Sequence, residues 1–70
     1  MKINAFGRDL DVRRKDDIWE VFDRGNEGKR RKARDITIPP KVREEELVAY
    51  LSDLLHEYAS ARHPEVLRID

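Results

Sequence analysis

The chain has 70 residues and no cysteine, and its 15 basic and 15 acidic side chains cancel to a formal net charge of zero. This length allows one small domain, and the composition excludes a disulfide framework, a thiolate metal site and an apolar membrane span. Charged residues are 43% of the chain, but low net charge and patterned apolar residues predict a folded, cytoplasmic domain over residues 1–70.

Residues 1–38 are predicted to form an antiparallel sheet. The run at 2–6 (KINAF) is strand-like, and after a turn containing a glycine, residues 10–14 alternate apolar with charged side chains, as in a hairpin. A charged turn leads to residues 18–23 (IWEVFD), the segment richest in aromatic and branched side chains. Three strands are therefore expected in succession.

A fourth strand is predicted to contain ITI at 36–38, after a glycine-rich loop at 24–29. Counting back in twos from the isoleucines places Arg34, Lys32 and Arg30 on the same face. Burying an unpaired cation in a core carries a large desolvation cost. The buried part of this strand is thus expected to begin near Arg34, with residues 29–32 projecting as the end of a hairpin.

An amphipathic helix is predicted over residues 43–62, after a proline-containing linker at 39–42. With Arg43 as N-cap, Glu46 takes the N3 position, which gives half a capping box without its Ser or Thr. The apolar stripe of the helix consists of Leu47, Tyr50, Leu51, Leu54, Leu55, Tyr58 and Ala61.

Pro64 ends this helix, and the tail at 65–70 either adds an edge strand or packs across the helix. The predicted fold class is α+β: a four-stranded antiparallel β-meander packed against one C-terminal amphipathic helix.

The third strand is apolar on both faces. If Ile18 and Phe22 face the helix, Trp19 and Val21 form an exposed apolar patch, which is the candidate protein-interaction site. The reverse assignment buries Trp19 and Val21 and leaves Ile18 and Phe22 outside.

The basic stretch at residues 29–34 supplies the candidate nucleic-acid contacts, and Arg13 and Arg14 of the sheet lie beside it. The alternative is a hairpin end that stays in solvent, where cations protect the edge from pairing. The predicted architecture is similar to that of small domains that lay a sheet into the DNA major groove, such as the plant AP2 and phage-integrase arm-binding types. The candidate contacts are Lys29, Arg30, Arg31, Lys32 and Arg34.

Catalytic and metal-binding patterns are weak. Asp53, His56 and His63 share a side of the helix, but two histidines without a clear third ligand rarely make a specific site. Ser52 near Asp53 and His56 lacks the buried acid and oxyanion hole of a triad. We expect no enzyme activity and no cofactor.

Several segments together resemble a family of short bacterial proteins of unknown function. They are FGR at 6–8, Trp19 with Phe22, IPP at 38–40, and YLSDLLHEYASARHP at 50–64, so the likeness covers nearly the whole chain. The resemblance implies a bacterial origin and a stand-alone domain, and no activity or functional residue.

Two functions are therefore predicted. The first is a non-enzymatic protein-interaction module, which binds an unidentified protein or self-associates as a homodimer through a sheet face. The second is a nucleic-acid-binding domain that uses residues 29–34 at low salt. No membrane association is expected.

Overall fold

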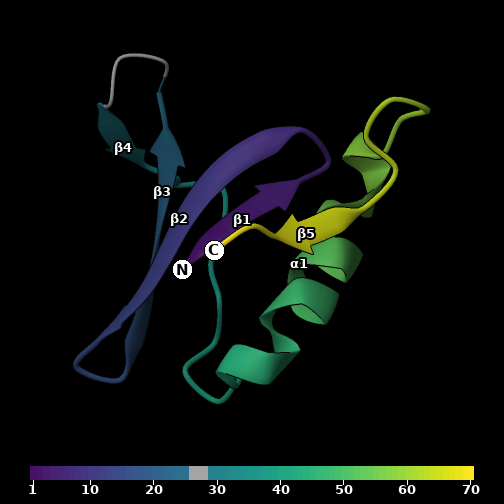
Figure 1. The fold of residues 1–70 in the computed structure, drawn as a ribbon. Helices are drawn as coiled ribbons and strands as arrows, with labels where there is room; N and C mark the ends of the chain where they lie inside the picture. Colours follow the sequence, from purple (N-terminus) through teal and green to yellow (C-terminus); the bar gives the residue numbers. More distant parts are fainter. Residues whose placement is uncertain (26–28) are drawn as a thin grey trace.

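The computed structural model describes residues 1–25 and 29–70 and shows an α+β fold with one antiparallel sheet and one C-terminal helix (Figure 1). The predicted class is confirmed, but the sheet has five strands, not four. The strands are β1 (Lys2–Ala5), β2 (Arg8–Lys15), β3 (Ile18–Arg24), β4 (Arg30–Lys32) and β5 (Val66–Arg68), in the spatial order β4-β3-β2-β1-β5. The tail thus forms an edge strand beside β1, which decides between the two alternatives for residues 65–70.

Two-residue turns connect the first three strands. Ala5 pairs with Arg8 around Phe6 and Gly7, whose φ angles are 52° and 90°. The second turn consists of Asp16 and Asp17, at φ 51° and 63°. Positive φ at both central residues is the type I′ geometry that matches the twist of a hairpin. A bulky residue such as Phe6 adopts it only when its surroundings enforce it.

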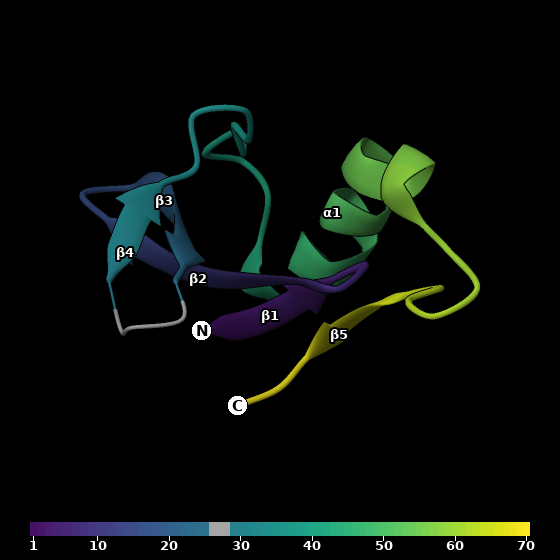
Figure 2. The ribbon, with the colours of Figure 1, turned by 90° about the horizontal axis from the view of Figure 1, so that it is seen from above.

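The predicted fourth strand is wrong in position. Residues Arg30–Lys32 form β4. The segment from Ala33 to Val42, which we call the crossing segment, then runs across the inner face of the sheet (Figure 2). Its apolar side chains are buried without strand pairing, as Ile36 (6% exposed) and Ile38 (4%) show. The expectation that residues 29–32 project beyond the sheet therefore fails, because pairing of β4 with β3 holds three of these four residues within it.

The helical layer is shorter than predicted. A 3-10 turn at Glu44–Glu46 precedes α1 (Leu47–Leu55), and a second one follows at His56–Tyr58, so helical structure ends at residue 58 rather than 62. Ala59 is extended, at φ −60° and ψ 140°. The side chain of Glu46 accepts a hydrogen bond of 3.0 Å from the Arg43 N–H, which confirms the half capping box.

The helix lies on one side of the sheet, as the view from above shows (Figure 2). Leu47, Leu51 and Leu55 are its buried residues, while Leu54 and Tyr58 of the predicted apolar stripe are exposed. They join a single core with side chains from the inner face of the sheet and from the crossing segment. That core contains Ile3, Ala5, Leu10, Val12, Trp19, Val21, Ala33, Ile36, Ile38, Val42 and Val66.

The crossing segment covers the Trp19 side of β3, while the helix contacts β1 and β5 on the same side of the sheet. Trp19 is 9% exposed and Val21 3%, whereas Ile18 is 59% exposed. The expected exposure of Trp19 and Val21 is wrong, and the reverse assignment holds. Neighbouring groups explain it: the Trp19 Nε1–H donates to the Val42 carbonyl at 2.8 Å, and the Arg14 guanidinium stacks on the indole, 4.8 Å from its centroid.

Candidate functional site

One face of the sheet remains open to solvent, because the helix and the crossing segment both lie on the other (Figure 2). Alternation along the paired strands assigns its residues. We call it the uncovered face, and it consists of Lys2, Asn4, Asp9, Asp11, Arg13, Lys15, Ile18, Glu20, Phe22, Arg24, Arg30, Lys32 and Leu67. Six of these side chains are basic and three are acidic, a net charge of +3 on a chain whose overall net charge is zero.

Phe22 lies near the middle of this face, and two arginines cover its ring. The guanidinium carbon of Arg13 is 5.3 Å from the ring centroid and that of Arg30 is 5.2 Å away, both within cation–π range. Arg30 reaches over β3 to Asp11 on β2, where its Nη1 donates to a carboxylate oxygen at 2.9 Å. Arg13 donates to Glu20 through Nε, also at 2.9 Å.

These contacts hold both guanidinium groups in fixed positions on the surface. Each arginine bonds one carboxylate among the described residues, and a guanidinium carries five N–H donors. The remaining donors suit the paired oxygens of a phosphate, which arginine binds bidentately. The uncovered face therefore offers preorganised anion-binding groups around an apolar centre.

The predicted basic residues divide between the face and its edge. Arg30 and Lys32 lie on the uncovered face, while Arg31 opposes Asp23 on the inner side and stays exposed. Lys29 and Arg34 flank the strand and are exposed. Of the two arginines expected beside the stretch, Arg13 lies on this face. The other, Arg14, points to the inner side, where it donates to the carbonyls of Val42 and Pro40.

Three further cations of the face were missed by the sequence reasoning, and one of them is Lys2 on β1. Lys15 and Arg24 project from β2 and β3 on the same side as Phe22. Strict alternation of these strands could have found them, but only after the face of β3 had been assigned. The predicted protein-interaction residues, Trp19 and Val21, belong instead to the core.

The opposite side of the molecule is acidic. Between residues 44 and 58 the helical layer carries five carboxylates and no lysine or arginine. All five are exposed: Glu44, Glu45, Glu46, Asp53 and Glu57. The neutral chain thus separates its charges, with the positive excess on the uncovered face and the negative one on the helix.

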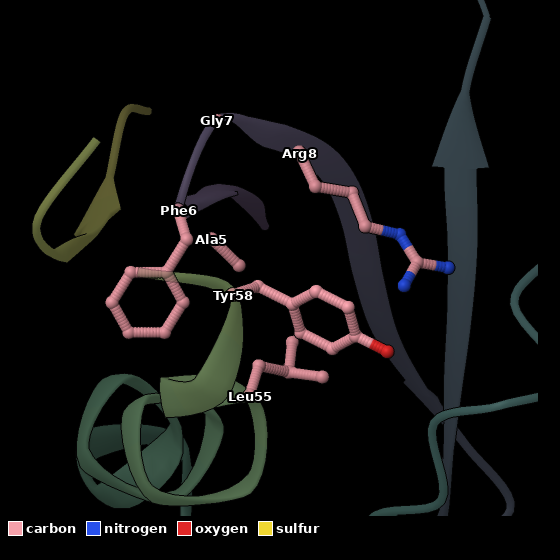
Figure 3. Close-up of a pocket in the computed structure, with 6 residues that line it drawn as sticks. All are labelled: Ala5, Phe6, Gly7, Arg8, Leu55 and Tyr58. Atoms are coloured by element: carbon pink, nitrogen blue, oxygen red, sulfur yellow. The ribbon is translucent and has the colours of Figure 1, made fainter. Parts of the chain in front are cut away.

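A separate pocket of about 380 Å³ lies between the first hairpin turn and the end of the helix (Figure 3). Phe6 and Tyr58 contribute aromatic rings, Ala5, Gly7 and Leu55 complete the apolar lining, and Arg8 extends from β2 toward β3. This lining supplies apolar contact, one guanidinium and one phenol hydroxyl. It contains no carboxylate, imidazole or thiol.

Arg8 is oriented by two carboxylates. Its Nε and Nη2 donate to Asp23 at 2.6 and 2.9 Å, and its Nη1 and Nη2 donate to Asp35 at 2.7 and 2.9 Å. Hydrogen bonding to Arg8 holds the pKa of Asp35 below its ordinary value, and the two carboxylates raise the pKa of Arg8. Arg8 therefore fastens the crossing segment at Asp35 to β2 and β3.

The residues considered for metal binding or catalysis lie on the helical layer and in the segment that follows it. Asp53 and His56 are exposed on it, and the His63 ring packs against Gly7 instead. Within residues 1–25 and 29–70, no three potential metal-ligating side chains cluster. None of the helices described there is both long and apolar enough to cross a membrane.

Fold and surface together define a small α+β domain with one helix-covered sheet face and one open, basic sheet face. The chain belongs to the family described as domain of unknown function DUF7661, whose model matches residues 1–70. Comparison with curated proteins and with solved structures finds no match.

Proposed function

We propose that this domain is a non-enzymatic module that binds nucleic acid through its uncovered face. The observation that carries the proposal is the pair of guanidinium groups, Arg13 and Arg30, held over Phe22 on a face with a net charge of +3. Affinity for nucleic acid comes largely from lysine and arginine contacts to phosphates, and flat arginine forks read guanine edges.

Duplex DNA is the ligand that the face favours. Three adjacent strands, β2 to β4, span about 10 Å at the usual strand spacing, and the major groove is about 12 Å wide. The ring of Phe22 is already covered by guanidinium groups, so it offers little surface for stacking an unpaired base. The carboxylates of the helix repel the phosphates of DNA, so DNA approaches from the sheet side.

A salt titration tests this proposal. Labelled duplex DNA, single-stranded DNA and RNA are each titrated with the protein by fluorescence anisotropy at several salt concentrations. If four cations of the face meet phosphates, the slope of log K against log salt is about −3.6 for duplex DNA. Binding of single strands alone would refute the choice of duplex. If none of the three binds in a salt-sensitive way, the domain is not a nucleic-acid binder.

A matched pair of variants separates the face from net charge. Arg24→Gln with Lys32→Gln removes one arginine and one lysine from the uncovered face, whereas Lys41→Gln with Arg62→Gln removes the same two charges elsewhere. We expect the first variant to flatten the salt slope by roughly 2 and the second to leave it nearly unchanged. Equal losses would show that only overall charge matters.

Protein interaction is the second candidate, favoured by exposed apolar side chains. Ile18 is 59% exposed on the uncovered face, and Leu67 (50%) and Ile69 (52%) are exposed at its C-terminal edge. The partner would be acidic where it meets the face and apolar near the edge. Sedimentation across a concentration range tests the homodimer form of this candidate.

A further inference from the structure

The two edges of the sheet differ in chemistry. At one edge, all three residues of β4 are exposed cations, Arg30, Arg31 and Lys32. Charged side chains on an edge strand prevent pairing with another chain, because like charges would meet across the new ladder. The other edge, β5, carries the exposed apolar side chains of Leu67 and Ile69 close to Arg68. Only the β4 edge is therefore protected by its sequence.

The β5 edge is held firmly in place. The Ile69 N–H donates to the Lys2 carbonyl at 2.9 Å, and the Phe6 N–H donates to the Glu65 carbonyl at 3.2 Å. The Nε of Arg68 bonds the carboxylate of Asp70 at 3.0 Å. The backbone that pairs with a new strand is thus already extended, so little ordering entropy is lost on docking.

The register with β1 fixes which backbone groups face outward. Residues 65 and 69 bond across the ladder toward β1, and Leu67 opposes Asn4 between them. Alternation along a strand then turns the backbone groups of Val66, Arg68 and Asp70 to the open side of β5. No described strand pairs with that side.

We propose that a second copy of this chain pairs with β5 in antiparallel orientation, with the two-fold axis at Arg68. A two-fold contact uses one patch twice, so the patch must complement itself. This register opposes Leu67 of each copy with Ile69 of the other, which places four apolar side chains together. The two Arg68 side chains meet at the axis, where each is compensated by its own Asp70.

The resulting dimer is weak. Only residues 66–70 of each copy pair, and stable interfaces normally bury about 1,200 Å² or more. Association is therefore concentration-dependent, and it makes a continuous ten-stranded sheet with a protected β4 edge at each end. The pairing does not depend on the proposed nucleic-acid binding, so it can be tested with the protein alone.

Disulfide trapping tests the register, because the natural chain has no cysteine. The Arg68→Cys variant places two thiols across the axis, at the Cα separation of about 5.5 Å that disulfides favour. Arg31→Cys, in the middle of the exposed β4 edge, is the matched control. At about 0.1 mM protein, Arg68→Cys should cross-link several-fold faster than the control, because the paired fraction holds its two thiols at an effective concentration on the order of 1 mM.

Equal cross-linking rates for the two variants would overturn the proposal, because they would report chance collisions. Sedimentation of the cysteine-free protein gives a second readout from about 10 μM to 1 mM. A weight-average mass that rises toward the dimer is expected, and Leu67→Asp should abolish the rise while its circular dichroism stays native. A strictly monomeric wild type over the whole range would also refute the pairing.

Discussion

Removing the Arg8 side chain tests how the crossing segment is held on the sheet. Arg8 makes four hydrogen bonds to Asp23 and Asp35, and its side chain is 32% exposed against 37% and 53% for the two carboxylates. Ion pairs at such exposure contribute about 0.2–1 kcal/mol each, with paired bonds at the upper end. Arg8→Gln should therefore lower the free energy of unfolding by about 1–2 kcal/mol at pH 7.

The pH dependence of this loss has a definite sign. Because the folded pKa of Asp35 lies below its unfolded value, folding favours the carboxylate form. The stabilisation is fully present above the unfolded pKa, about 3.9, and is lost as pH falls through the lower folded pKa. The difference in unfolding free energy between wild type and Arg8→Gln should thus be largest at pH 7 and shrink below about pH 4.

Urea denaturation followed by the fluorescence of Trp19 measures this difference at several pH values between 7 and 3. Arg62→Gln is the control, because it removes the same charge from an exposed residue that forms no ion pair within the described chain. It should change the unfolding free energy by less than about 0.5 kcal/mol. A loss for Arg8→Gln that is equal at pH 7 and pH 3 would refute the electrostatic explanation and indicate lost packing instead.

Three further substitutions test local structure by the same denaturation assay. Arg43→Ser should stabilise the fold by about 1 kcal/mol, since Ser can accept an N–H that arginine cannot; no gain would place the helix start elsewhere. Gly7→Ala should cost at least about 1 kcal/mol, because φ is 90° and the new Cβ would lie 2.7 Å from the His63 ring; a neutral result would mean that the turn relaxes. Trp19→Phe should cost about 1 kcal/mol through the lost bond to Val42, and unchanged stability by circular dichroism would contradict that bond.

The elements that depend on local pattern were predictable from the sequence. Alternating residues in β2 and the aromatic and branched residues of β3 predict the central hairpin, and the leucine spacing predicts the helix. Its end was misplaced, because residues 59–63 turn back: the Ser60 N–H donates to the His63 carbonyl, and the Ser60 hydroxyl accepts from the His63 N–H. Such a turn competes with the helix, and the spacing of apolar residues gives no sign of it.

The features that were missed depend on contacts between distant residues. The isoleucines at 36 and 38 alternate as in a strand, but Asp35 bonds Arg8, 27 residues away, and the chain turns onto the inner face of the sheet instead. Strand β5 forms by pairing with β1 at the other end of the chain.

The candidate site was predictable only in part, because its position also depends on contacts between distant residues. The cations of the basic stretch at 29–34 are exposed, and Arg30 lies on the uncovered face with Arg13. The covered face of β3 depends on the groups that contact Trp19 and Phe22. The alternation of side chains along β3 cannot reveal those groups. Lys15 and Arg24 could not be added to the site before that choice.

Acrylamide quenching of Trp19 tests most directly whether the crossing segment covers the Trp19 side of β3 and leaves the Phe22 side open. Trp19 is the single tryptophan of the chain, so the signal has one source. At 9% exposure, its quenching constant in the native protein should be several-fold lower than in urea. Native quenching as strong as that of the unfolded chain would mean that the indole lies on the open face, and the basic face described above would lose its structural basis.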